Sequence, residues 1–175
     1  TTFTIPSDFS SAALLLSAAV LIGENLTIQI TMGKLPQADE AIIDILEVLG
    51  AVVTLEKGHI TIKSPAKLEG GRFDLSNSPD LLPAIAILAL KETKPIEIFN
   101  VEHARYKETD RIAILARELG KLGVKVVEKK DGLILKNSGK LTGADLNSEN
   151  DHRLFMAFCI AGMYIGNCTV SDPES

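Results

Sequence analysis

The sequence predicts an α/β fold built from repeated βαβαββ units, and three observations support this prediction. Apolar residues recur with the short period of strands and the longer period of helices, in an alternating order. Asp8, Asp80 and Asp151, spaced 72 and 71 residues apart, each precede a segment rich in alanine and leucine. Gly50-Ala-Val-Val has a counterpart 73 residues later, at Gly123-Val-Lys-Val. Repeats of this length are supersecondary units that must pack together to close a core.

The first unit is predicted to hold four strands and two helices. Alternating apolar residues predict strands at residues 3–5, 26–30, 52–55 and 60–62. Helical spacing predicts helices at residues 10–21 and 38–49. Asp8 precedes the first helix, so we expect its carboxylate to bind free backbone N–H groups there, as Asp80 and Asp151 would in the later units. Gly50 and Gly123 are expected to end the second helices of their units.

The same order of elements returns from Gly71 onward. Four strands are expected, at residues 72–75, 96–99, 124–127 and 133–135, and two helices, at residues 81–90 and 111–122. A third unit starts at Gly143 and is expected to hold a helix at 154–165 and a strand at 168–171. We therefore expect one incomplete domain, with repeats at residues 1–66, 67–139 and, truncated, 140–175.

The composition fits one soluble globular domain. Of the 175 residues, 46% are apolar and 23% charged, which suffices for a sizeable core. A formal net charge of -5, without long basic runs, argues against a nucleic-acid partner. No apolar stretch approaches the roughly 20 residues of a membrane span. Thr1 begins the sequence without a secretion signal or an initiator methionine, so we expect a cytoplasmic fragment.

The two cysteines give little chemical information. Cys159 and Cys168 lie nine residues apart in an apolar segment, a spacing that matches no metal site. A disulfide between them is the alternative to two reduced, buried thiols. We expect reduced thiols and no metal.

The strongest functional signal is a charged segment that departs from the repeat. Residues 34–38 of the first unit align with Lys107-Glu108-Thr109-Asp110-Arg111 of the second, and only the lysine is shared. Cations beside a helix N-terminus cost a few tenths to about 1 kcal/mol each, and a bound anion would offset this cost. Arg105 adds positive charge nearby. The alternative is a solvated helix start in which Arg111 pairs with Glu108 or Asp110 and nothing binds.

The third unit also begins its helix with a cation. Arg153 lies in the first turn, where the first unit has Ser10. His152, just before it, is expected to cap the helix or bond to backbone rather than to act in catalysis.

Asp80 is the candidate base. It follows Pro79 at the start of an almost wholly apolar helix. A carboxylate that shares a pocket with Lys107, Arg111 and Arg153 would stay ionised and could accept a proton from a substrate hydroxyl. Glu108 is the candidate acid. Two carboxylates in different surroundings suit an addition–elimination reaction.

Three segments together resemble the EPSP synthase family of enolpyruvyl transferases. They are residues 74–83, 105–112 and 150–153, which occur in the order and approximate spacing of that family, and the resemblance covers essentially the whole chain. It implies two domains, each made of three βαβαββ units in an inside-out α/β barrel, with the active site between them. The missing partner would be the N-terminal domain, without which we expect no activity.

The resemblance also implies residue roles. Asp80 would contact shikimate-3-phosphate and act as general base, Lys107 would contact the same substrate, and Glu108 would donate a proton. Arg111 and Arg153 would hold phosphoenolpyruvate. The enolpyruvyl group would pass to the shikimate 5-hydroxyl with release of phosphate, without a metal or an organic cofactor.

Two departures and two alternatives accompany this reading. His103 stands where many members have a substrate-binding asparagine, and the family's lysine beyond the Asp172-Pro173 pair lies outside the chain. A UDP-N-acetylglucosamine enolpyruvyl transferase shares the fold, although the segment from Lys107 to Arg111 speaks against it. A non-catalytic anion-binding or assembly domain on the same scaffold is the other alternative.

Overall fold

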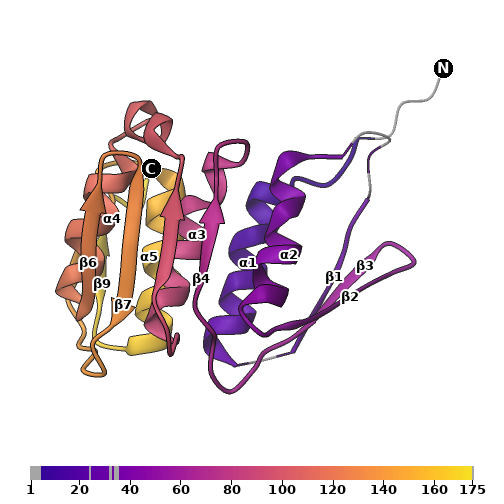
Figure 1. Ribbon diagram of the computed structural model, residues 1–175, viewed down its shortest axis with the longest axis horizontal. Helices are drawn as coiled ribbons and strands as arrows, with labels where there is room; N and C mark the ends of the chain where they lie inside the picture. Colours follow the sequence, from indigo (N-terminus) through magenta and orange to yellow (C-terminus); the bar gives the residue numbers. More distant parts are fainter. Residues whose placement is uncertain (1–4, 24, 32, 34–35, 175) are drawn as a thin grey trace.

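Three α/β layers follow one another along the chain in the computed structural model, which describes residues 5–23, 25–31, 33 and 36–174 (Figure 1). The first layer is an antiparallel sheet in the order β1-β3-β2. Its strands are β1 (Leu26–Gln29), β2 (Val52–Glu56) and β3 (His59–Lys63). Its helices are α1 (Phe9–Ile22), the 3-10 turn η1 (Ala38–Ala41) and α2 (Ile42–Val48).

The second layer is a mixed sheet in the order β4-β5-β7-β6, in which β4 and β5 are parallel and the other pairs antiparallel. Its strands are β4 (Gly71–Asp74), β5 (Ile96–Phe99), β6 (Val124–Lys129) and β7 (Gly132–Asn137). Its helical segments are η2 (Pro79–Leu81), α3 (Leu82–Ala86), η3 (Ile87–Leu90), η4 (Glu102–Tyr106) and α4 (Arg111–Lys121). The third layer pairs β8 (Asp145–Asn147) with β9 (Thr169–Ser171) in parallel, beside α5 (His152–Ile165).

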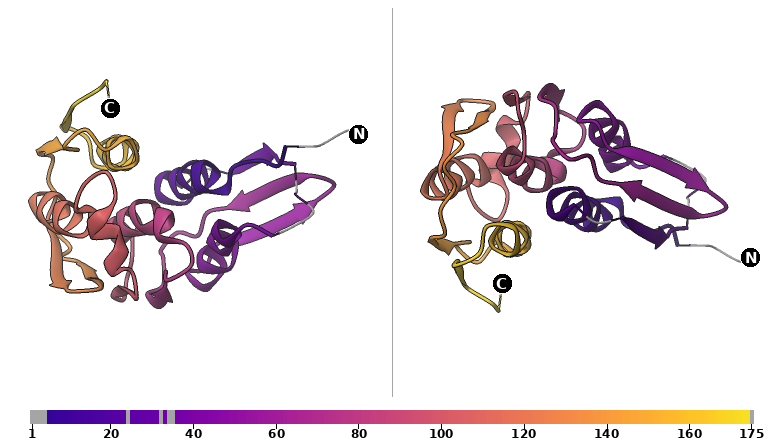
Figure 2. Two further views of the ribbon diagram at one scale, coloured as in Figure 1. Left: turned by 90° about the horizontal axis from the view of Figure 1, so that it is seen from above. Right: turned by 90° about the horizontal axis from the view of Figure 1, so that it is seen from below.

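The core lies among the helices that come first in each layer. Every residue of the segment from Leu82 to Leu90 is buried, because α1, α4 and α5 surround it. A helix that is apolar on every side is stable only when it is enclosed in this way. Figure 2 shows the helices near the middle and the strands toward the periphery. Most of the helices therefore lie inside and the sheets outside, as the resemblance implied.

Most predicted elements are confirmed, with small corrections. The helix predicted at 81–90 is divided into η2, α3 and η3, and that at 38–49 into η1 and α2. The short elements β8 and η4 were not predicted. The strand predicted at 3–5 falls mainly outside the described residues, and Ile5 itself is not in a strand. Gly50 and Gly123 end their helices with φ of 99° and 95°, as predicted.

The cysteines are free, as expected, but our expectation of full burial was wrong. Cys159 and Cys168 are both only partly buried. No helix within the described ranges combines the length and apolar character required to cross a membrane.

Glu92 makes stability depend on pH. It is 6% exposed; its Oε1 accepts from the backbone N–H of Asn137, and its Oε2 has no partner among the described residues. Burial raises the pKa of Glu92 more than the bond from Asn137 and the charge of Lys136 lower it. A carboxyl group whose pKa is raised by folding contributes stability at low pH, and that contribution is lost as pH rises through the folded-state pKa.

We therefore expect Glu92→Gln to gain in stability relative to the unmodified chain as pH rises from 5 to 8. Urea unfolding at several pH values measures this difference. The exposed Glu56 provides the control, as Glu56→Gln, for which we expect a constant difference. Parallel pH profiles for Glu92→Gln and the unmodified chain would contradict the assignment.

Candidate functional site

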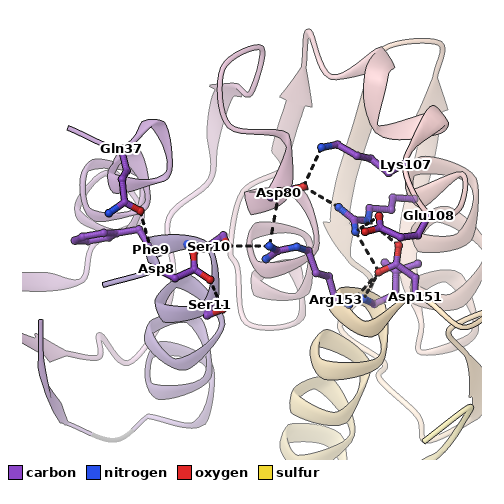
Figure 3. A network of polar contacts seen from close by, with 12 residues as sticks. Asp8, Phe9, Ser10, Ser11, Gln37, Asp80, Lys107, Glu108, Asp151 and Arg153 are labelled. Atoms are coloured by element: carbon purple, nitrogen blue, oxygen red, sulfur yellow. Dashed lines mark hydrogen bonds and ion pairs between the residues drawn. The ribbon is translucent and has the colours of Figure 1, made fainter. Parts of the chain in front are cut away.

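The starts of α1, η2, α4 and α5 bring charged side chains together at one edge of the helical core (Figure 3). Asp8 caps α1 by accepting from the N–H of Ser10 at 2.9 Å. Asp151 caps α5 by accepting from the N–H groups of Arg153 at 2.9 Å and Leu154 at 3.2 Å. Both caps were predicted from the repeat.

Asp80 departs from this pattern. Its side chain makes no capping bond to η2. Instead its carboxylate lies 2.9 Å from Arg111 Nη1, 3.4 Å from Lys107 Nζ and 3.7 Å from Arg153 Nη2. The prediction of a capping role was therefore wrong for Asp80, because three cations compete successfully for its oxygens. The structure thus places Lys107, Arg111 and Arg153 around Asp80, the arrangement that the sequence analysis considered for this carboxylate.

Arg111 is the centre of this cluster and is fully buried. Its Nε lies 2.7 Å from Asp151 Oδ2, its Nη1 lies 2.9 Å from Asp80, and its Nη2 lies 2.6 Å from Glu108 and 3.3 Å from Asp151 Oδ1. A guanidinium has five N–H groups. These four contacts therefore give four of the five a carboxylate acceptor. The cost of this cation at a helix start is thus offset by the protein's own carboxylates. The pairing with Glu108 that we considered as the alternative is present.

Arg105 does not add its charge to the cluster, contrary to expectation. Its guanidinium binds Asp110 at 2.8 Å and Glu128 at 2.9 Å, and it also donates to backbone carbonyl groups of the β6–β7 turn. Asp110 in turn caps α4 by accepting from the N–H of Ala113 at 3.0 Å. Arg105 therefore fixes the segment that leads into α4.

The electrostatic balance keeps the carboxylates charged. Burial on its own raises the pKa of Asp80, but the charges of Arg153, Lys107 and Arg111 outweigh it, and the pKa is lowered. For Asp151, burial again opposes ionisation, and the bond and charge of Arg111 overcome it to lower the pKa. Asp80 remains about one-third accessible, with 29% of its side chain exposed. It is therefore an ionised carboxylate that a ligand can reach.

Glu108 and Lys107 lie on the open side of the cluster. Their side chains are 48% and 34% exposed, whereas that of Arg153 is 15% exposed. Within the described part of the chain, Glu108 is held by Arg111 at one oxygen. The arrangement combines two accessible carboxylates with two cations that are not fully buried, which is suited to binding an anion and moving protons.

The first unit also contributes to the site, which the sequence did not suggest. Ser10 accepts from Arg153 Nη2 at 2.8 Å. Asp39, on η1, is close enough for the charges of the cluster to affect its ionisation. Burial is the largest cause that raises the pKa of Asp39, and the negative charge of Asp80 is the second. Lys34, the repeat counterpart of Lys107, lies outside the described residues.

The histidines are not joined to the cluster. His103 is exposed on η4 and has no hydrogen bond or ion pair to the residues that the structure describes. His152 is likewise exposed, and our expectation that it would cap α5 or bond to backbone was wrong: Asp151 caps α5, and the His152 side chain makes no hydrogen bond to the described residues. Within the described part of the chain, no group of three His, Cys, Asp or Glu side chains is placed to hold a metal ion. A cavity of about 390 Å³, lined by Lys67, Lys91 and Tyr164 among others, contains none of the cluster residues.

Comparison with known proteins gives a family model and relatives that carry the same name. The whole chain, residues 1–175, matches the family model of EPSP synthase (3-phosphoshikimate 1-carboxyvinyltransferase). It is 69% identical over 174 residues to the 3-phosphoshikimate 1-carboxyvinyltransferase of Nitrosopumilus maritimus, covering 99% of this chain and 41% of that protein. It is 41% identical over 172 residues to the enzyme of that name from Methanococcus maripaludis strain C5, covering 98% of this chain and 40% of that protein. The chain thus spans about two-fifths of the length of these relatives.

Solved structures with the same arrangement are also enolpyruvyl transferases by name. The EPSP synthase of Acinetobacter baumannii superposes with a TM-score of 0.86 at 28% identity, covering 97% of this chain and 42% of that one. The enolpyruvyl transferase NikO of Streptomyces tendae superposes with a TM-score of 0.72 at 21% identity, covering 96% and 39%. The second likeness shows the fold alone.

Proposed function

The chain belongs to the EPSP synthase (3-phosphoshikimate 1-carboxyvinyltransferase) family, and from this membership we propose that it forms one domain of a two-domain enzyme. That enzyme would transfer the enolpyruvyl group of phosphoenolpyruvate to the 5-hydroxyl of shikimate-3-phosphate and release phosphate. The share of about two-fifths that the chain covers in its relatives supports a second domain. We propose that the chain itself is a single incomplete domain whose repeats span residues 1–66, 67–139 and 140–175.

The observation that carries the proposal is the placement of Asp80 against three cations. Lys107, Arg111 and Arg153 come from different elements yet lie within 3.7 Å of the Asp80 carboxylate. They keep Asp80 ionised, so it can take the proton of the attacking 5-hydroxyl. In the same step a proton would be added to the methylene carbon of phosphoenolpyruvate, with Glu108 as its donor. The loss of a proton from the resulting methyl group and of phosphate would then restore the double bond.

The anionic substrate would bind where the cluster already holds carboxylates. Arg153 and Lys107 each pair with one carboxylate of the described chain, that of Asp80, and Lys107 is partly open to solvent. Arg111 would bind the substrate in place of Glu108, whose carboxylate lies 2.6 Å from Arg111 Nη2. This exchange would free Glu108 for proton transfer when the substrate arrives. His103 would bind shikimate-3-phosphate from outside the cluster, since it makes no hydrogen bond or ion pair with the cluster residues that the structure describes.

The function is tested by comparing acceptors on the two-domain enzyme. We expect phosphate release from phosphoenolpyruvate with shikimate-3-phosphate and none above background with UDP-N-acetylglucosamine. Preference for the nucleotide sugar would overturn the proposed substrate. Absence of phosphate release with both acceptors would favour the non-catalytic domain that the sequence left open.

A further inference from the structure

A contact from the first layer reaches the arginine at the start of α5. Arg153 Nη2 donates to Ser10 Oγ at 2.8 Å, across 143 residues of sequence. Each of the two residues lies two positions after the aspartate that caps its own helix. The matched positions of two repeats therefore contact each other directly, as Figure 3 shows.

The hydroxyl of Ser10 is oriented to receive this contact. It donates its single hydrogen to Asp8 Oδ1 at 2.7 Å, which leaves only lone pairs to face Arg153. Ser10 is 5% exposed, so little water competes for those lone pairs. A chain of two hydrogen bonds thus joins Arg153 to Asp8 through the Ser10 hydroxyl.

Asp80, the ion-pair partner of Arg153, holds it less firmly. Asp80 lies 3.7 Å from Arg153 Nη2, which is beyond hydrogen-bond distance. An ion pair at that distance attracts the guanidinium without fixing the direction of its N–H groups. Ser10 is therefore the contact that sets the orientation of this side chain.

We infer that Ser10 is a positioning residue that orients Arg153 for the carboxylate or phosphate of phosphoenolpyruvate. This inference rests on the proposed function, in which Arg153 binds that substrate. A long arginine side chain loses rotamer freedom when it binds an anion, and a side chain already held in place loses less. Ser10 thus connects the first repeat to substrate affinity without touching the substrate.

The test compares two neighbouring serines in the two-domain enzyme. Ser11 also donates to Asp8, at 2.6 Å, but its side chain makes no other hydrogen bond to the residues that the structure describes. We expect Ser10→Ala to raise KM for phosphoenolpyruvate by about fivefold to tenfold, with kcat and KM for shikimate-3-phosphate unchanged. Ser11→Ala should leave all three constants near those of the unmodified enzyme. Equal effects of the two variants, or an unchanged KM for phosphoenolpyruvate in Ser10→Ala, would overturn the inference.

A second measurement does not depend on activity. The guanidinium N–H signals of Arg153 in NMR spectra of the two-domain enzyme should shift or broaden in Ser10→Ala but not in Ser11→Ala. Ser10→Cys fills nearly the same space with a weaker acceptor, and should give the same result if the alanine variant does not fold. Unchanged Arg153 signals would overturn the inference. If the unmodified enzyme transfers nothing from phosphoenolpyruvate, the proposed function fails, and the NMR comparison still decides whether Ser10 holds Arg153.

Discussion

Replacing Asp151 with alanine should lower the free energy of unfolding by about 3–5 kcal/mol, because Arg111 would keep its charge in a buried site without its main partner. Both side chains are fully buried, and Asp151 contacts Arg111 at two nitrogens. The loss of the α5 cap adds about 1 kcal/mol. Since this sum approaches the total stability of many domains, a large fraction of the variant should be unfolded at room temperature.

Urea unfolding followed by circular dichroism measures this effect, and the repeat supplies its control. Asp8 caps α1 as Asp151 caps α5, but it is exposed, and its carboxylate bonds to Ser10 and Ser11 rather than to an arginine of the described chain. Asp8→Ala should therefore cost only about 1 kcal/mol. Similar losses for the two variants would mean that the buried pair with Arg111 contributes little.

Replacing Asp80 with asparagine in the two-domain enzyme should lower kcat by about 10²-fold to 10⁴-fold, the usual effect of removing a general base. Asparagine keeps the shape and one acceptor oxygen, so the contact with Arg111 Nη1 at 2.9 Å can persist. It cannot take a proton from the 5-hydroxyl. We expect KM values to change much less than kcat.

Steady-state kinetics measures this change, and Asp74→Asn is the matched control. Asp74 ends β4, six residues before Asp80, and binds Asn100 and the N–H of Ser76 outside the cluster. Its variant should keep nearly full kcat. If Asp80→Asn retained more than about a tenth of kcat, a base role for Asp80 would be untenable.

The fold was largely predictable because the repeat acts as an internal comparison. Capping by Asp8 and Asp151 and the glycines at helix ends depend on local backbone chemistry, which a sequence shows directly. The division of the 81–90 segment depends on tertiary packing around it, which periodicity does not show. The strand β8 has a single apolar residue, Leu146, between Asp145 and Asn147, so its sequence shows no apolar run or alternation.

The cluster could be predicted only in part, since the sequence shows which charges exist but not which ones meet. Arg111 was expected to need an external anion. In the structure its partners are Asp80 and Asp151, which lie 31 and 40 residues away in sequence. Burial of an arginine follows from those distant carboxylates, because an unpaired cation would not be stable inside the core.

Ser10 was missed for a related reason. The repeat aligns it with Arg153, but an alignment of two positions does not show that their side chains meet in space. In the structure Ser10 is buried at the start of an apolar helix. It faces the cation at the matched position of another repeat, and the two side chains are in contact. Packed repeats bring their helix starts together, so residues at matched positions of two repeats can contact each other.

The most direct test of the central claim, that this chain supplies one wall of an enolpyruvyl transfer site, is phosphate release by the chain with and without the partner domain. The chain alone should release no phosphate from phosphoenolpyruvate and shikimate-3-phosphate. Addition of the separately produced partner domain should restore turnover, and Asp80→Asn in the chain should abolish it again. Turnover by the chain alone, or full turnover with Asp80→Asn, would contradict the account.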